Sequence, residues 1–283
     1  MHDKTDRRNI EELNKIAAEI RLELLRMFSF GKAQHFGGSL SCVELVTALF
    51  FDRMNFSADL IDDPERDRFI MSKGHAVPVQ YVALAMLGVF DIDELKTIKT
   101  LGTRLQGHPD ILKTPGIEAP TGSLGQGLSF ANGLAFAGRL DGNEFNIYLI
   151  LGDGELQEGQ IWEAAMTSAH YKLANICILI DTNKYQSQGK VNQMMSVEPL
   201  IDRWRAAGWE ARRIDGHNLA DITAALDEFD GAGDKPHVII ADTIKGKGIA
   251  FMEDTFEFHN FALSETQYAM AMDELVEKSG GGE

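Results

Sequence analysis

Two short segments carry residues of the type and spacing that a magnesium site needs. The turn Gly-Asp-Gly at 152–154 directly follows the apolar run NIYLIL, and Asn183 follows the next apolar run, NICILI, thirty positions after Asp153. Carboxylate and amide oxygens are hard ligands that suit Mg²⁺, which completes its octahedron with phosphate oxygens and water. The pair therefore predicts a magnesium-diphosphate site, although such a turn alone is more often purely structural.

Short apolar runs that alternate with helical patterns predict the elements that position this site. The runs lie at 68–72, 146–154, 175–183, 209–215 and 237–243, and helical patterns lie between them at 125–139, 161–171 and 219–229. Runs that are apolar on both faces favour a mainly parallel sheet covered by helices on both faces, an α/β fold. Ligands bind such sheets at the carboxyl ends of the strands, so we expect Asp153 on a solvent-facing strand end.

The whole chain, residues 1–283, is expected to form one domain, with a flexible Gly-rich tail at about 279–283. Apolar residues recur every three or four positions from Asn9 to Met27, which predicts an amphipathic helix. A second helix is expected to begin at Ser41, whose spacing to Glu44 is that of a capping box.

Composition excludes several classes of protein. The net charge is −16, with 27 basic and 43 acidic residues, which disfavours binding to nucleic acid or an anionic membrane surface. The longest apolar stretch, YVALAMLGVF, is too short to span a bilayer, and the charged N-terminus is unlike a signal peptide. Cys42 and Cys177 lie in segments that suggest buried free thiols, so we expect a cytoplasmic protein.

The segment from 152 to 189, GDGELQEGQIWEAAMTSAHYKLANICILIDTNKYQSQG, resembles the thiamine-diphosphate motif in its transketolase form. Further segments resemble transketolases in the same order, from about Ala33 to Gly248: AQHFGGSLSCVEL, FIMSKGHAVPVQYVAL, LQGHPD, PTGSLGQGLSFANGLA, IDGHN and TIKGKG. The resemblance implies the thiamine-diphosphate-binding fold, with thiamine diphosphate and Mg²⁺ as cofactors.

The same resemblance assigns roles around the diphosphate. Asp153 and Asn183 would bind Mg²⁺, with the backbone carbonyl of Tyr185 as a third ligand. The backbone amide of Gly154 would reach the diphosphate.

Further roles concern the cofactor rings and the substrate. His75 and His259 would contact the diphosphate and the substrate side of the thiazolium, and Gly122 and Leu124 would pack against the cofactor rings. Glu158 would lie at a dimer contact, where it helps to position the partner's glutamate.

His35 and His108 would line the substrate channel and exchange hydrogen bonds or protons with the sugar. Transfer of a two-carbon unit creates and removes alkoxides, so groups that titrate near pH 7 are useful there. Two other residues have open interpretations. His217 is favoured as a turn or cap residue. Lys245 could approach an anion or belong to a solvated turn.

The resemblance covers only the first domain of a full transketolase, which also has a pyrimidine-binding and a C-terminal domain. It thus implies the N-terminal subunit of a split transketolase that acts on sugar phosphates or analogues. A separate partner chain would supply the pyrimidine-binding domain with its activating glutamate, and an α2β2 heterotetramer is expected. Two alternatives remain: a non-catalytic regulatory subunit that binds thiamine diphosphate, or half of a deoxyxylulose phosphate synthase or dehydrogenase E1 component.

Overall fold

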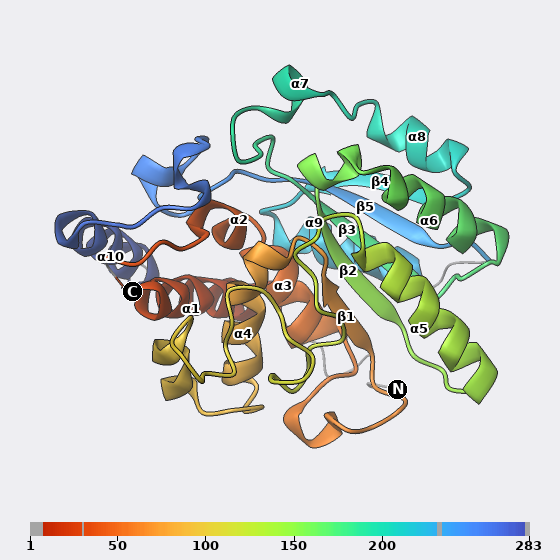
Figure 1. Ribbon diagram of the computed structural model, residues 1–283, viewed down its shortest axis with the longest axis horizontal. Coiled ribbons are helices and arrows are strands. Elements are labelled where there is room, and N and C mark those ends of the chain that lie inside the picture. The colour runs from red at the N-terminus through yellow and green to blue at the C-terminus, as the bar shows by residue number, and fades with distance from the viewer. Residues whose placement is uncertain (1–7, 30, 231–233, 281–283) are drawn as a thin grey trace.

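The computed structural model in Figure 1 describes residues 8–29, 31–230 and 234–280. Its centre is a five-stranded parallel sheet in the order β1-β2-β3-β5-β4. The strands are β1 (Arg68–Met71), β2 (Ile147–Gly152), β3 (Ile176–Thr182), β4 (Glu210–Asp215) and β5 (His237–Asp242). Each strand lies within one of the five apolar runs, so the predicted parallel α/β fold is confirmed.

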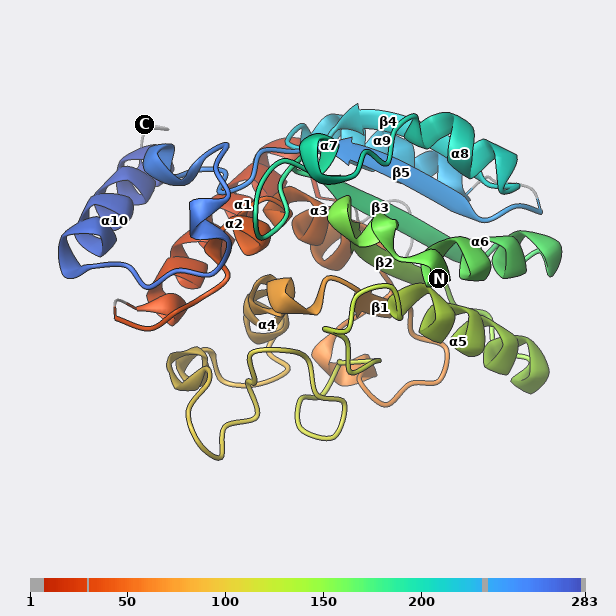
Figure 2. The same cartoon turned by 45° about the horizontal axis from the view of Figure 1, so that its top comes forward.

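Helices cover both faces of the sheet, as the two views in Figures 1 and 2 show. One face packs against α1 (Ile10–Phe28), α3 (Val43–Ala48), α4 (Val77–Met86) and α9 (Leu219–Asp230). The other packs against α5 (Gly127–Asp141), α6 (Gly159–His170) and α8 (Leu200–Ala206). Helix α10 (Glu265–Gly280) lies along α1, and the short helices α2 (Phe36–Leu40) and α7 (Val191–Met194) lie in loops.

Short helical turns complete the described chain. A π-helical turn spans Leu49–Arg53, and 3₁₀ turns span Ala58–Leu60, Gly74–Ala76, Ile92–Thr97, Gly154–Gln157, Ala250–Met252 and Glu257–His259. Residues 279 and 280 of the expected flexible tail belong instead to α10, which continues through Gly280. The last three residues of that tail, 281–283, lie outside the described residues.

The central strands β2 and β3 are apolar along most of their length because each contributes to two cores. In β3, Cys177 and Leu179 belong to the core beneath α1, α3, α4 and α9. Ile178 and Ile180 belong to the core beneath α5, α6 and α8. Side chains alternate between the two faces of a strand, so a sheet covered on both faces needs an unbroken apolar run.

The two N-terminal helix predictions had different outcomes. Helix α1 begins as predicted, with a capping box in which Asn9 Oδ1 accepts from the Glu12 amide at 2.9 Å. The capping box expected at Ser41 is wrong. Helix α3 begins at Val43 without a side-chain cap, and the Ser41 hydroxyl instead donates to Asp181 Oδ2 at 2.6 Å. Ser41 is the C-cap of α2 and has helical φ and ψ, whereas an N-cap residue has non-helical dihedrals.

The described residues include no helix with the length and apolarity that a bilayer crossing requires. The cytoplasmic location stays a prediction.

Cys42 and Cys177 are both buried and are not joined in a disulfide, as expected. Burial raises the pKa of the Cys42 thiol to about 11, from an ordinary value of 9.0. The folded state holds this proton more tightly than the unfolded state does. The protonated thiol therefore stabilises the folded chain fully below pH 9, and this stabilisation is lost as the pH rises to about 11.

We therefore expect neither thiol of the native chain to react with a disulfide reagent at pH 8, since the reactive thiolate of Cys42 is rare and inaccessible. Denaturant should release two reactive thiols per chain. The absorbance of the released reagent gives the number of reactive thiols in the native chain and in the denatured chain. A Cys42→Ala chain should release one thiol only after unfolding, and rapid native labelling would contradict the burial of these side chains.

Candidate active site

The carboxyl edge of the sheet brings the predicted magnesium ligands together. Gly152 pairs with Asp181 across β2 and β3, so Asp153 and Asn183 follow on neighbouring strand ends, as predicted. The amide of Lys184, next to Asn183, donates to Asp153 Oδ2 at 2.7 Å. The amide of Gly154 donates to Asp153 Oδ1 at 2.8 Å. The two strand ends are therefore joined directly through the Asp153 carboxylate.

Asp153 does not lie on a solvent-facing strand end, because only 3% of the residue is exposed. The expectation of an exposed carboxylate was wrong, since the turn at 152–154 folds back beneath the loop that follows β3. Burial, followed by the nearby charge of Asp181, raises the pKa of Asp153 to about 7. A buried carboxylate of this kind is stabilised by a bound cation.

The donor set fits Mg²⁺ better than a softer metal. Asn183 Oδ1 accepts one hydrogen bond, from the Tyr185 amide at 3.2 Å, and Tyr185 contributes a backbone carbonyl. Among the described residues, no group of three or more His, Cys, Asp or Glu side chains is arranged to hold a metal. A site of one carboxylate, one amide and one carbonyl suits Mg²⁺, which takes few protein ligands and keeps water and phosphate oxygens.

Four predicted histidines meet beside this edge. The ring centroid of His35 lies 5.2 Å from that of His75, 5.5 Å from that of His259 and 6.2 Å from that of His108. His75 and His259 are 5.0 Å apart by the same measure. These residues come from four separate segments, so the fold gathers them into one cluster, here called the histidine cluster.

The expectation that these histidines titrate near pH 7 was wrong. Burial, reinforced by neighbouring cations and imidazoles, lowers the pKa of His35 to about 3 and that of His259 to about 4. Burial also lowers the pKa of His75 well below its ordinary value, and that of His108 by a smaller amount. The histidine cluster is therefore neutral at pH 7, and each ring offers one donor and one acceptor.

The loop before α5 requires glycine where it meets the histidine cluster. Gly122 has a φ of 137°, and a Cβ there would lie 2.6 Å from the His108 ring. A Cβ on Gly74, next to His75, would lie 2.6 Å from the backbone of the same loop. Half-buried Leu124 follows in this loop. The glycines thus allow the segments of His75 and His108 to approach each other.

Glu158 lies at the start of α6 and is exposed. Its Cβ packs against Gly125, where an added methyl group would come within 2.8 Å. The carboxylate therefore stands beside the loop of Gly122 and Leu124, with solvent on its other side.

Sequence reasoning missed Glu155, which is 2% exposed. Its Oε1 accepts from the Ser72 hydroxyl at 2.5 Å and from the Gly125 amide at 3.0 Å, and its Oε2 accepts from the Gly152 amide at 3.1 Å. This carboxylate ties together three loops that surround the site. Its position in the 152–158 segment was visible, but two of its partners, Ser72 and Gly125, lie 83 and 30 positions away and gave no local signal.

Lys245 is 1% exposed, so the solvated-turn interpretation is wrong. Its Nζ lies 2.9 Å from His259 Nδ1 and donates to the Tyr185 carbonyl at 3.2 Å. Burial lowers the pKa of Lys245 to about 8. The ammonium group therefore connects the histidine cluster with the proposed metal edge.

His217 combines a turn with a side-chain bridge. Its amide donates to Asp215 Oδ1 at 2.9 Å, which agrees with the turn interpretation. Its ring lies between Glu44 Oε2, at 3.0 Å, and the amide of Ile244, which donates to Nε2 at 2.8 Å. His217 thus anchors the segment that leads to Lys245 and stands outside the histidine cluster.

Comparisons with known proteins agree with this geometry. Residues 13–277 match the family described as transketolase, thiamine diphosphate binding domain. A subunit of the apulose-4-phosphate transketolase of Phocaeicola vulgatus is 39% identical over 269 residues, covering 95% of each chain. The 6-deoxy-6-sulfo-D-fructose transketolase subunit SqwG of a Clostridium species is 45% identical over 246 residues, covering 87% of this chain and 89% of the relative.

Solved structures lead to the same family. The transketolase of Campylobacter jejuni has a TM-score of 0.88 and 29% identity over 95% of this chain, which spans only 43% of that structure. These relatives favour transketolase over the deoxyxylulose phosphate synthase and E1 alternatives. The chain belongs to the transketolase family, as an N-terminal, thiamine diphosphate binding transketolase subunit.

Proposed function

We propose that this chain forms one diphosphate-binding domain, over residues 1–283, of an enzyme that transfers a two-carbon ketol unit from a ketose to an aldose. The observation that carries the proposal is the histidine cluster beside the strand ends of Asp153 and Asn183. Bound thiamine diphosphate supplies the electron sink for this chemistry. The residues of this chain supply binding, orientation and hydrogen bonds.

Asp153, Asn183 and the Tyr185 carbonyl, which also accepts from Lys245 Nζ, would bind Mg²⁺. The Gly154 amide, which donates to Asp153 Oδ1, would lie beside the diphosphate. The donor chemistry of these groups and the raised pKa of Asp153 support this assignment. Burial of the carboxylate keeps water from competing for it.

His75 and His259 would contact the diphosphate and the substrate side of the thiazolium, with Gly122 and Leu124 against the cofactor rings. His35 and His108 would line the substrate channel. Because their pKa values are lowered, they would act at pH 7 as neutral hydrogen-bond donors and acceptors to sugar hydroxyl and carbonyl groups.

The partner would be a separate C-terminal subunit with a pyrimidine-binding domain and the activating glutamate. The relatives are named as transketolase subunits, which supports a divided enzyme. Glu158, exposed at the start of α6, would help to position the partner's glutamate. Two copies of each chain would form an α2β2 heterotetramer.

The donor would be a ketose that carries an anionic group. One relative is named for a branched sugar phosphate and another for a sulfonated sugar, so the donor class includes phosphates and their sulfonate analogues. We expect the assembled pair to release a shortened aldose from at least one of xylulose 5-phosphate, apulose 4-phosphate and 6-deoxy-6-sulfofructose.

Mass spectrometry of both products, with ribose 5-phosphate as acceptor, measures the transfer, because the seven-carbon ketose phosphate formed differs in mass from each donor. A complex that carries Asp153→Ala in this chain is the matched control. Absence of transfer from every donor, combined with decarboxylation of a 2-oxo acid, would contradict the proposal and favour an E1 component.

A further inference from the structure

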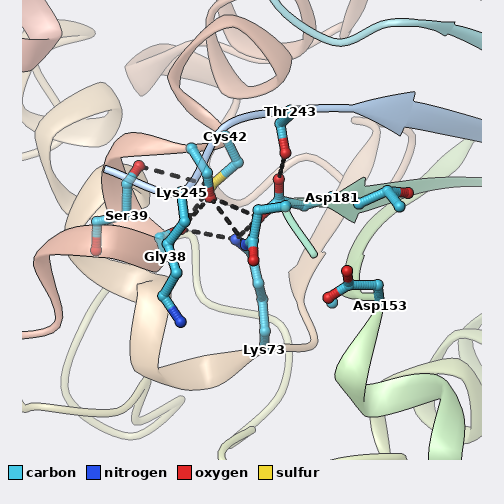
Figure 3. Close-up of polar contacts among 12 residues, drawn as sticks. Gly38, Ser39, Cys42, Lys73, Asp153, Asp181, Thr243 and Lys245 are labelled. Atoms are coloured by element: carbon cyan, nitrogen blue, oxygen red, sulfur yellow. Dashed lines mark hydrogen bonds and ion pairs between the residues drawn. The ribbon is translucent and has the colours of Figure 1, made fainter. Parts of the chain in front are cut away.

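A buried ion pair between Lys73 and Asp181 lies at the same edge of the sheet as Asp153, as Figure 3 shows. Asp181 is the sixth residue of β3 and is fully buried, and Lys73 follows β1 and is 2% exposed. Lys73 Nζ donates to Asp181 Oδ2 at 2.5 Å. Charged residues are rarely buried to this extent unless they are paired. The pair lies at the carboxyl edge of the sheet, which is also the edge that carries Asp153 and Asn183.

Further hydrogen bonds connect this pair to two other segments. Asp181 Oδ2 also accepts from the Ser41 hydroxyl at 2.6 Å, and Asp181 Oδ1 accepts from the Thr243 hydroxyl. Lys73 Nζ also donates to the Gly38 carbonyl at 2.7 Å. The pair thus joins the ends of β1, β3 and β5 to α2 and the residue that follows it.

The segments joined in this way are those that carry the site. Lys73 lies two residues before His75, and Thr243 lies two residues before Lys245. Asp181 likewise precedes Asn183 by two residues. In Figure 3, Asp181 stands between Lys73 and Thr243, with Asp153 on the neighbouring strand end.

The hydrogen bond between Asn183 and Asp181 decides which way the Asn183 amide faces. Asn183 Nδ2 donates to Asp181 Oδ2 at 2.8 Å and to the Ser41 hydroxyl oxygen at 3.3 Å. A carboxylate that carries charge can only accept hydrogen bonds, so the amide nitrogen must face Asp181. The amide oxygen then faces away from Asp181 and, apart from the Tyr185 amide, has a lone pair available.

We propose that Asp181, charge-balanced by Lys73, is a positioning residue that holds the Asn183 amide oxygen toward the magnesium ion. The inference rests on the proposed function, because it concerns the metal that Asp153 and Asn183 would bind. Without the carboxylate, the Asn183 amide loses the acceptor that distinguishes its nitrogen from its oxygen. Partners behind metal ligands commonly change metal affinity about 10- to 100-fold.

The test replaces the pair by apolar residues in the Asp181→Leu/Lys73→Met double variant, assembled with the partner subunit. This change removes the acceptor without leaving one buried charge unpaired, and such replacements are often tolerated. We expect the Mg²⁺ concentration for half-maximal thiamine diphosphate binding, measured by calorimetry, to rise about 10- to 100-fold. The turnover number should recover at saturating Mg²⁺, which a general structural defect would not permit.

The matched control is a second ion pair at the same edge. Arg213 forms a bidentate pair with Asp242, at 2.8 and 2.9 Å, on β4 and β5, and its other hydrogen bond goes to Glu198, so the pair is not bonded to the Asn183 amide. The Asp242→Leu/Arg213→Met variant should keep the wild-type Mg²⁺ dependence. Should the buried double variant fail to fold, Asp181→Asn, which keeps one carbonyl acceptor, is measured in its place and should show a smaller rise in the same direction.

Wild-type Mg²⁺ dependence in the variants of Asp181 would overturn the inference. Asp153→Ala distinguishes this result from a failure of the proposed function. If Asp153→Ala loses Mg²⁺ dependence while the Asp181 variants keep it, only the positioning role is wrong. If Asp153→Ala also behaves as wild type, the metal assignment itself is wrong.

Discussion

Replacement of Asp153 by alanine is expected to abolish magnesium-dependent binding of thiamine diphosphate. The proposed site has one carboxylate, and its loss leaves only an amide and a backbone carbonyl as protein ligands. Mg²⁺ is strongly hydrated and needs a charged ligand to remain in a site of this kind. Calorimetry on the assembled complex should therefore show at least a roughly 100-fold loss of cofactor affinity, beyond the effect of a single outer partner.

The burial of Asp153 changes the expected effect on stability. An exposed carboxylate would cost the folded chain little, whereas here alanine leaves the amides of Gly154 and Lys184 without their acceptors. Each unsatisfied buried amide costs about 1–3 kcal/mol, and relief from burying a carboxylate offsets part of this cost.

Asp153→Asn is the matched variant that separates binding from stability. Its amide oxygen can still accept one of the two hydrogen bonds, but it carries no charge. Without metal, we expect Asp153→Asn to unfold in urea close to the wild-type midpoint. Like Asp153→Ala, it should lose magnesium-dependent binding of thiamine diphosphate. Unchanged cofactor affinity in both variants would contradict the assignment of Asp153 as a metal ligand.

The sheet and the meeting of its strand ends could be predicted from sequence because both follow from local patterns. Apolar runs of the right length specify strands, and alternation with helices specifies a parallel arrangement. Asp153 and Asn183 then had to lie at one edge, and the register of β2 and β3 places them there. The four histidines required the family resemblance as well, since nothing local links His35 to His259.

Burial and pairing at the site could not be predicted, because they depend on residues far apart in the sequence. Lys73 and Asp181 are 108 positions apart, yet they form one buried pair. The Ser41 hydroxyl has the sequence position of a helix cap, but the fold places Asp181 beside it. The low pKa values of the histidine cluster have the same origin, since burial by distant segments is their largest cause. One signal was visible: a charged residue, Asp181, at the end of a fully apolar run.

The last prediction concerns the chain without its partner, which is expected to have no ketol transferase activity and to gain activity on mixing. In the proposed enzyme, residues of this chain would bind the metal and the diphosphate and would line the substrate channel. In the proposed enzyme, the glutamate that activates the cofactor belongs to the partner. Glu158, which would position that glutamate, is exposed at the start of α6 and is therefore free to meet a partner chain.

Activity should rise from background to full turnover as partner is added, and light scattering should give the mass of two copies of each chain. Closed two-fold assemblies are the commonest oligomers, and a two-fold contact would place each Glu158 beside a partner chain. The Asp153→Ala chain should assemble to the same mass without activity, which separates assembly from cofactor binding. Turnover by the purified single chain, shown by mass to contain no partner, would refute the divided site. A stable, active one-to-one heterodimer would refute the α2β2 arrangement alone, because one copy of each chain would then complete an active site.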